Sequence, residues 1–313
     1  MSSCNTSIPQ PLIFVLAGIP GLDSSQGWLS VPFFLVFVAA VIGNATILCI
    51  VRMEESLHEP MFLFLAVLSA VDLSLVTVTV PRMLGIFWMN AKEISFSACL
   101  TQMFFIPLFY VMESGILLAM AFDRFVAIWH PLRYTTILSN NMLVKIALAV
   151  LARAVAVLTP APILAKRLGH FQTHVIAYSY CFMAVVKLAC VDTGATKRYS
   201  LSMATIIGSC DAVLIAVSYV FILRSVFHLP SQEARFKALG TCGSHVCVIL
   251  VFYSTAGFSI FTHRFGKNIP AHIHIFIANM YLLVPPFLNP IVYGVRTKKI
   301  RELVLKTLMV KGV

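Results

Sequence analysis

Seven long apolar segments alternate with short polar connections along this chain. They lie at roughly 29–53, 60–84, 97–128, 141–164, 198–224, 236–262 and 270–293. A helix rises about 1.5 Å per residue, so about 20 residues cross the hydrocarbon core of a bilayer. A backbone in lipid must satisfy its polar groups internally, and the alternating pattern of a barrel strand is absent. The pattern therefore predicts an all-α membrane protein with a seven-transmembrane helix bundle.

The composition agrees with a membrane protein. Charged residues make up only 11% of the chain, against about a quarter in soluble domains. The basic residues behind the net charge of +11 lie between and after the apolar segments rather than on one face, so we expect no nucleic-acid partner. Residues 1–28 lack the basic region and cleavage site of a signal peptide, so we expect the first segment to direct membrane insertion.

Basic residues set the predicted orientation. Residues 1–28 contain no Lys or Arg, whereas the segment after the seventh span is rich in both. The positive-inside rule places that segment in the cytoplasm, and seven spans place the N-terminus outside. Asn5 begins the sequon Asn5-Thr6-Ser7 and is then accessible for glycosylation.

The predicted organisation has three parts. An extracellular tail at 1–28 precedes a bundle at 29–293, which includes a long extracellular loop at 165–197, and a cytoplasmic tail follows at 294–313. In this last part basic residues alternate with Ile300, Leu303, Val304 and Leu308. That spacing predicts a short amphipathic helix on the anionic membrane surface, and a disordered basic tail is the alternative.

Ionisable residues inside apolar spans are costly and mark candidate functional positions. They are Asp72, Glu113, Asp123, Arg124, Arg153 and Asp211. Cys99 and Arg124 lie about 37 Å apart along one helix, so they mark opposite rims of the bundle. Asp72 and Glu113 lie at mid-membrane depth, where two carboxylates repel unless a cation or a proton separates them. The sequence assigns no role to Arg153 or Asp211.

Several short motifs together resemble a known family. They are LHEPMF at 57–62, MAFDRFVAI at 120–128, HPLRY at 130–134, KALGTCGSH at 237–245, PPFLNP at 285–290 and NPIVY at 289–293. With Asp72, these motifs resemble the odorant (olfactory) receptors among the rhodopsin-like G-protein-coupled receptors. THRFG at 262–266 and the long loop are similar to the class I, or fish-like, branch with its 51 and 52 families.

The resemblance implies a receptor for a small, mostly apolar odorant that activates a heterotrimeric stimulatory, olfactory-type G protein and raises cyclic AMP. It implies a multi-pass plasma-membrane protein of the cilia of olfactory sensory neurons. The sequence contains no recognisable nucleophile motif, so we expect no enzyme activity. Two alternatives remain: a metabolite-sensing receptor of the same family in another tissue, and a transporter or channel, which the lack of repeated halves disfavours.

The resemblance also implies a disulfide between Cys99 and Cys181, which would fix the long loop over the mouth of the bundle. An unpaired Cys99 is the alternative. Cys190 is left over, because Phe171 occupies the position where relatives commonly carry its partner. Cys4 is a candidate replacement, and a free thiol at Cys190 is the other possibility.

The resemblance assigns roles to two groups of residues, one for G-protein coupling and one for an ion. The G-protein coupling and switch residues are Asp123, Arg124, Tyr219, Lys237, Asn289, Pro290 and Tyr293. Asp72, Glu113 and Asn289 form a candidate sodium site, the one cofactor considered, with a plain hydrogen-bond network as the alternative. Phe125 replaces the Tyr usual after Arg124.

The expected ligand pocket lies in the outer third of the bundle. Its candidate residues are Ile106, Tyr110, Met203, Ile207, Tyr253, Ser254, Phe258, Phe261, Arg264 and Ala278. The resemblance associates Arg264 with carboxylate ligands, and a guanidinium fits a carboxylate well. The odorant is therefore expected to include carboxylic acids, with an exposed loop arginine as the alternative. Pro107 replaces a histidine that relatives often carry.

Overall fold

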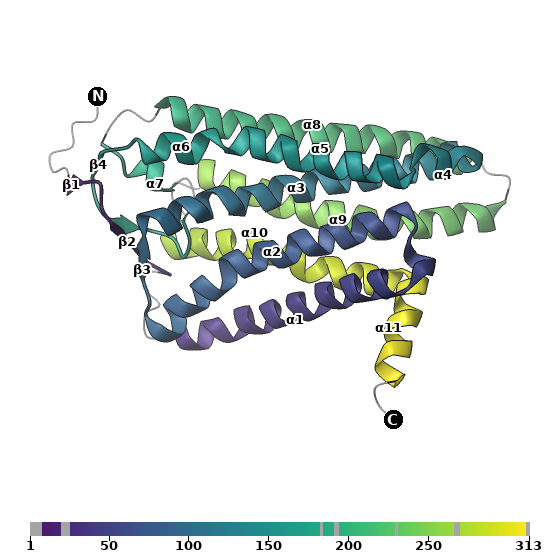
Figure 1. Cartoon of the computed structure of the whole chain (residues 1–313), viewed down its shortest axis with the longest axis horizontal. Helices are drawn as coiled ribbons and strands as arrows, with labels where there is room; N and C mark the ends of the chain where they lie inside the picture. The colour runs from purple at the N-terminus through teal and green to yellow at the C-terminus, as the bar shows by residue number, and fades with distance from the viewer. Residues whose placement is uncertain are drawn as a thin grey trace.

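The computed structural model describes residues 8–19, 26–181, 184–190, 194–228, 231–265 and 270–310. Long helices run side by side along the longest axis of the molecule (Figure 1). They are α1 (Gln26–Met53), α2 (Pro60–Met89), α3 (Phe96–Trp129), α5 (Asn140–Leu158), continued by α6 (Pro160–Lys166), α8 (Gly194–Phe227), α9 (Gln232–Phe265) and α10 (Ala271–Arg296). Within the described residues, 7 spans are long and apolar enough to cross a membrane. The predicted fold class is confirmed.

The fourth span departs from the prediction of one segment over 141–164. It divides at Thr159, between α5 and α6. Pro160 and Pro162 carry no N–H and cannot donate to the carbonyls of Ala156 and Leu158, so the helix is interrupted there. α8 begins at Gly194, so the helix starts inside the loop expected over 165–197.

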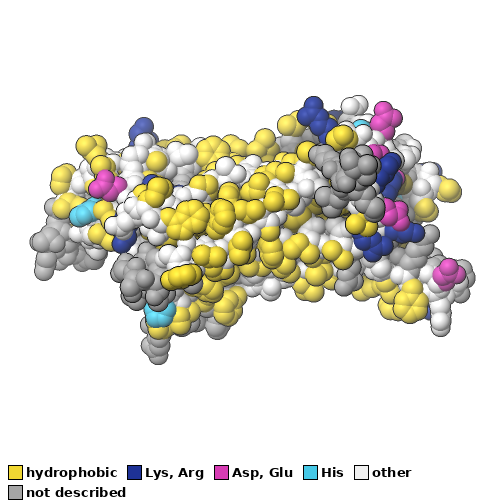
Figure 2. Space-filling view, turned by 90° about the horizontal axis from the view of Figure 1, so that it is seen from below, with side chains coloured by type: hydrophobic (Ala, Val, Ile, Leu, Met, Phe, Trp, Pro, Cys, Tyr) yellow, Lys and Arg dark blue, Asp and Glu magenta, His cyan; other side chains and the backbone are white. Residues whose placement is uncertain are grey.

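The outer surface of the bundle is suited to lipid. On the face seen in Figure 2, hydrophobic side chains cover the long middle section, whereas charged side chains gather towards the two ends. Val220 and Leu250 are 64% and 63% exposed, respectively. Large exposed apolar patches on a soluble protein favour association, whereas a membrane accommodates them.

The end of the bundle that carries Cys99, called the Cys99 end below, has a small β cap. β2 (Ile13–Leu16) pairs with β3 (Glu93–Ser95) and with β5 (Val175–Ile176), and β1 (Ile8–Pro9) pairs with β4 (His170–Phe171). Phe14 and Leu16 are fully buried in a cluster with Phe171 and Ile176. The sequence predicts only a tail for this N-terminal part, because strands this short have little pattern of their own.

The opposite end, called the Arg124 end, carries η1 (Glu55–Leu57), η2 (Pro131–Arg133) and α4 (Tyr134–Ile137). α11 (Lys298–Val310) follows α10 and turns away from the bundle axis (Figure 1). Ile300 is 1% exposed, and Leu303 and Val304 pack against the core. The predicted amphipathic helix is confirmed, and the disordered-tail alternative is wrong for residues 298–310.

α11 is also fixed by polar contacts. Lys299 donates to the carbonyl of Ser56 and lies 3.1 Å from the Glu59 carboxylate. Its Nζ lies 5.4 Å from the centre of the Phe62 ring, within cation–π range. These contacts join α11 to the start of α2.

Candidate functional site

A cavity of about 400 Å³ lies between α3, α5, α8, α9 and α10, with Tyr180 of the long loop in its wall. Five candidate ligand residues line it: Ile106, Tyr110, Met203, Ile207 and Tyr253. The lining is mostly apolar, as expected for a small-molecule pocket. Whether these side chains contact a ligand stays a prediction.

Other candidates lie elsewhere. Ser254 and Phe258 are exposed on α9 and are absent from the cavity lining. They lie four positions apart, so they share a helix face, and that face points away from Tyr253. Ala278 packs with Leu282 behind the wall. The side chains of Phe261 and Arg264 lie outside the described residues.

The wall also contains aromatic residues that are not among the candidates predicted from sequence. The Tyr110 ring stacks on Phe252 with a centroid distance of 4.4 Å and lies 4.4 Å from the Tyr281 ring. Phe252 and Tyr281 both line the cavity. Aromatic residues are frequent along the spans, so no local spacing distinguishes these two from residues that face lipid.

An ion pair between Arg153, 33% exposed, and the buried Asp211 lies behind the polar end of the cavity. Arg153 on α5 donates to both carboxylate oxygens of Asp211 on α8, at 2.6 and 2.8 Å. Ser114 on α3 donates to Asp211 Oδ2 at 2.8 Å and lies 3.0 Å from the Tyr253 hydroxyl. This chain of four side chains, called the cavity network below, joins four spans, and it gives Arg153 and Asp211 the partners that the sequence did not reveal.

Gly115 makes room for this pairing. A Cβ atom at Gly115 would lie 2.8 Å from Nη2 of Arg153 and 2.8 Å from Val150. Since real Cβ atoms do not approach this closely, a larger residue would push α5 away from α3. The glycine thus allows the guanidinium to reach across the bundle to Asp211.

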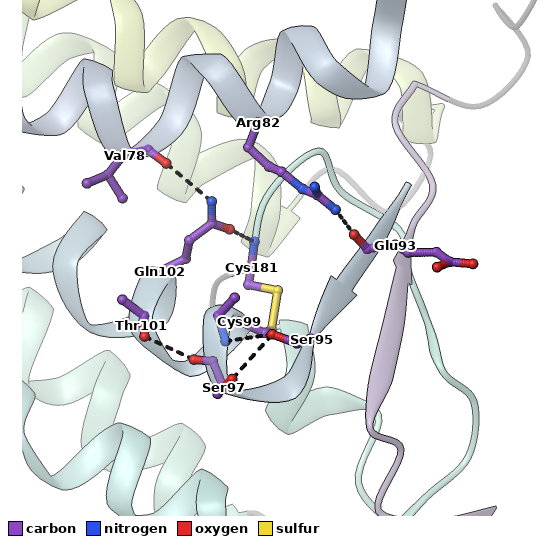
Figure 3. The surroundings of a disulfide bond; sticks show 10 residues. Val78, Arg82, Glu93, Ser95, Ser97, Cys99, Thr101, Gln102 and Cys181 are labelled. Atoms are coloured by element: carbon purple, nitrogen blue, oxygen red, sulfur yellow. Dashed lines mark hydrogen bonds between the residues drawn. A yellow bond between two sulfur atoms is a disulfide. The ribbon is translucent and has the colours of Figure 1, made fainter. Parts of the chain in front are cut away.

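A disulfide joins Cys99 at the start of α3 to Cys181 in the long loop (Figure 3). Beside it, Gln102 donates to the Val78 carbonyl at 3.2 Å and accepts from the Cys181 N–H at 3.1 Å. The bridge predicted by resemblance is therefore present, and the unpaired-Cys99 alternative is wrong. Because Tyr180 precedes Cys181, the bridge holds one side of the cavity roof.

At the Arg124 end, Asp123 forms an ion pair with the adjacent Arg124. Asp123 Oδ2 lies 3.3 Å from Nε of Arg124, and its other oxygen accepts from the Tyr134 hydroxyl at 2.7 Å. Burial, together with the negative charge of Asp123, raises the pKa of Tyr134, so this hydroxyl stays protonated and remains a donor. Arg124 is thus restrained at the rim by a charged neighbour.

The other switch candidates lie close by. The Tyr219 hydroxyl lies 2.8 Å from Nδ1 of His245, between α8 and α9. Tyr293 is fully buried, with its hydroxyl 3.9 Å from the Met120 sulfur. Lys237 lies on α9, but its side chain lies outside the described residues.

α10 approaches α1 closely at Pro290. A Cβ atom on Gly43 of α1 would lie 2.8 Å from the Pro290 ring. The missing side chain of Gly43 therefore leaves room for the proline. Pro290 also cannot donate to the carbonyl of Pro286, and Asn44 donates to that carbonyl instead at 2.8 Å.

The candidate sodium site is a buried cluster of oxygens. Asn289 Nδ2 donates to Asp72 Oδ2 at 2.9 Å and to Glu113 Oε1 at 3.1 Å. Three further oxygens, Asp72 Oδ1, Glu113 Oε2 and Asn289 Oδ1, are buried without a hydrogen-bond partner in the described part of the chain. Buried unpartnered oxygens of this kind fit a hard cation, which takes oxygen ligands.

Comparison with known proteins decides the family. The family model described as olfactory receptor matches residues 33–311. The chain belongs to the olfactory receptor family. It is 52% identical to olfactory receptor 52A5 of Homo sapiens over 100% of both chains. It is also 52% identical to olfactory receptor 52B2 of Homo sapiens, over 96% of this chain and 94% of the relative.

Family membership confirms several predictions from sequence. The similarity to human family 52 members agrees with the class I resemblance. An olfactory receptor is a multi-pass membrane receptor and not an enzyme. Receptor function is also favoured over the transporter or channel alternative.

In this olfactory receptor Cys190 is disulfide-bonded, so the free-thiol alternative is wrong. The Cys190 N–H donates to the His170 carbonyl at 2.9 Å. Phe171, which follows His170 on β4, pairs with Ile8 of β1, so the N-terminal strand β1 runs close to Cys190. Pairing with Cys4 stays a prediction, because Cys4 lies outside the described residues.

We predict that Cys4→Ser and Cys190→Ser lower the stability of the receptor by the same amount, and that the double variant is no less stable than either single variant. Loss of one bridge lowers the stability of a folded protein by about 2–5 kcal/mol. Peptide mapping without reduction and the thermal stability of the purified receptor measure this. Cys210→Ser, at an exposed free cysteine, is the matched control. A peptide that joins Cys190 to any other cysteine contradicts the prediction.

Proposed function

We propose that this olfactory receptor binds a small, mostly apolar odorant in the 400 Å³ cavity and activates a stimulatory G protein at the Arg124 end, which raises cyclic AMP. The observation that carries the proposal is the cavity network. It joins the polar end of an apolar cavity to α3, the helix that carries Arg124 and its partner Asp123 near its inner end.

The proposed coupling uses two packed states of the bundle. At the Arg124 end, Cys242 of α9 packs against Ile222 and Val226 of α8, with Phe125 of α3 beside them. A ligand that contacts Tyr253 on α9 and Tyr110 on α3 favours one arrangement of these helices only if it binds that arrangement more tightly. An outward movement of the inner part of α9 would expose Arg124 to the G protein.

The proposal includes an orientation and a location. The Cys99 end would face outside, since its disulfides need an oxidising compartment, and α11 would lie on the anionic inner leaflet. Asn5 would then carry a glycan outside the cell. We further propose the plasma membrane of the sensory cilia as the site of action, and immunolabelling of intact neurons tests this.

Arg124→Ala tests the coupling. We expect it to abolish the odorant-evoked rise in cyclic AMP, because the G protein loses its charged contact, while odorant binding to the purified receptor persists. Arg52→Ala, an exposed arginine at the end of α1, is the matched control and should signal normally. A normal cyclic AMP response of Arg124→Ala at equal surface level contradicts the proposal, as does nucleotide exchange on inhibitory G proteins alone.

We also propose that sodium occupies the cluster formed by Asp72, Glu113 and Asn289. The ion would offset one of the two negative charges of the carboxylates and stabilise the inactive packing of α2, α3 and α10. The unpartnered oxygens support this proposal over the hydrogen-bond network alone, because that network leaves one oxygen of each carboxylate unsatisfied.

Asp72→Asn should remove the effect of sodium on this receptor. In the native receptor we expect sodium to raise thermal stability and to lower odorant affinity about fivefold or more, the usual range for coupled sites. Choline at equal ionic strength controls for screening, and Glu93→Gln controls for loss of an acidic group. Equal stability of the native receptor in sodium and in choline contradicts the proposal.

A further inference from the structure

We propose that the Tyr253 oxygen at the polar end of the cavity accepts a hydrogen bond but has no proton to donate, so that the receptor selects ligands with a neutral donor group, such as an alcohol or a phenol. The inference rests on the proposed function, since it names the ligand class of the same cavity. It follows from a count of protons along the cavity network.

The ion pair fixes the direction of the first hydrogen bond in the cavity network. Asp211 is 2% exposed and receives both guanidinium nitrogens of Arg153, so it is an ionised carboxylate. An ionised carboxylate has no proton and only accepts. Ser114 therefore donates its single proton to Asp211 Oδ2 in the 2.8 Å contact between them.

The direction of the next hydrogen bond is then fixed. Ser114 and Tyr253 lie 3.0 Å apart, and Ser114 has no second proton to give. Tyr253 must therefore be the donor. A phenol has one proton, so the Tyr253 oxygen presents only lone pairs to the cavity that it lines.

Three other tyrosines of the wall donate their protons to backbone carbonyls. Tyr199 donates to the Val157 carbonyl at 3.0 Å. Tyr110 and Tyr180 donate over longer contacts of 3.4 Å, to the carbonyls of Phe252 and Ala278. Their protons point to backbone carbonyls, and Tyr110 has the Tyr281 hydroxyl as a further hydrogen-bond partner, so Tyr253 is the acceptor on which the inference rests.

This polarity sets the ligand chemistry. No lining residue of the cavity carries a charge among those that the structure describes. A carboxylate placed against Tyr253 would lose its hydration and meet an oxygen lone pair, which is costly. An alcohol of the same length would give its proton to Tyr253 and place its alkyl chain against the apolar wall. An ether or a ketone would fit but would leave that acceptor unpaired.

The test compares head groups at fixed chain length. Purified receptor in lipid nanodiscs is titrated with an alkan-1-ol, the matching methyl ether, the methyl ketone and the alkanoic acid, and binding is read from thermal stabilisation. We expect the alcohol to bind about tenfold tighter than the ether at neutral pH, as one hydrogen bond allows. The ionised acid should bind more weakly than the alcohol. Its affinity should rise by up to about tenfold per pH unit as acidification restores its proton.

Two variants and one control variant locate the effect. Tyr253→Phe should bring the alcohol down to the affinity of the ether, and Tyr178→Phe, at a tyrosine outside the cavity lining, should change nothing. Ser114→Ala removes the acceptor for the Tyr253 proton and frees it for a ligand. The ketone should then gain affinity relative to the alcohol.

The outcomes separate this inference from the proposed function. Tight binding of the carboxylate at neutral pH, insensitive to Tyr253→Phe, overturns the inference and favours the role predicted for Arg264. Absence of binding by every alcohol also overturns it. The expected order of binding without any rise in cyclic AMP in receptor-expressing cells supports the inference and contradicts the proposed function.

Discussion

Replacing Arg153 with Ala should cause one of the two largest losses of stability that we predict for this receptor. The substitution leaves Asp211, only 2% exposed, charged and without its cation inside the membrane-spanning bundle. Removal of one partner of a buried ion pair costs about 3–5 kcal/mol, because the remaining charge has neither water nor a counter-ion. We expect most of the variant to be retained inside the cell.

The measurements are surface level by flow cytometry and thermal stability of the purified receptor. Lys145→Ala is the matched control, since Lys145 is an exposed cation on the same helix, and it should behave as the native receptor does. The double variant Arg153→Met with Asp211→Leu should recover part of the stability, because it leaves no buried charge. If Arg153→Ala alone reaches the surface at native level and stability, the pair does not stabilise the bundle.

Replacing Cys99 with Ser should release the long loop from α3. The bridge joins residues separated by 82 positions. In the entropic model, closing a loop of that length destabilises the unfolded chain and so raises the free energy of unfolding by about 4–5 kcal/mol. The β cap and the cavity roof at Tyr180 would also lose their anchor. We expect loss of surface expression and, in the fraction that folds, weaker odorant binding.

Cys181→Ser should give the same result, and the double variant should be no worse than either, because each removes the same bond. Cys210→Ser is the control at an exposed free cysteine. Surface level, thermal stability and odorant affinity are compared across the four variants. Native values for Cys99→Ser would show that the loop is held by the β cap and by the Gln102 contacts instead.

The local sequence pattern was sufficient to predict the membrane-spanning helices and the residues at the rims of the bundle. A span is defined by hydrophobicity over about 20 residues, which is a property of consecutive residues. The Asp123-Arg124 pair and the amphipathic segment near Ile300 are also consecutive or closely spaced, so both were visible. Cys99 and Cys181 were paired only through the family resemblance.

The site was predictable only in part, because burial on the inner side of a bundle depends on neighbouring helices. Tyr253 and Ser254 are adjacent in sequence and similar in polarity, yet only Tyr253 lines the cavity. The rotation of α9 about its axis decides between them. No apolar periodicity separates the face of a span that meets lipid from the face that meets another helix, since both are hydrophobic.

The sequence by itself determined the seven spans, the family and the charged rim at Arg124, because each depends on residues that are close along the chain. Only the tertiary structure decided that Arg153 meets Asp211, that Ser114 and Tyr253 extend the pair to the cavity, and that the N-terminal strands cover the Cys99 end. Contacts between distant segments depend on how the helices pack. That packing is set by many small contacts, such as the missing side chain at Gly115, which no short motif records.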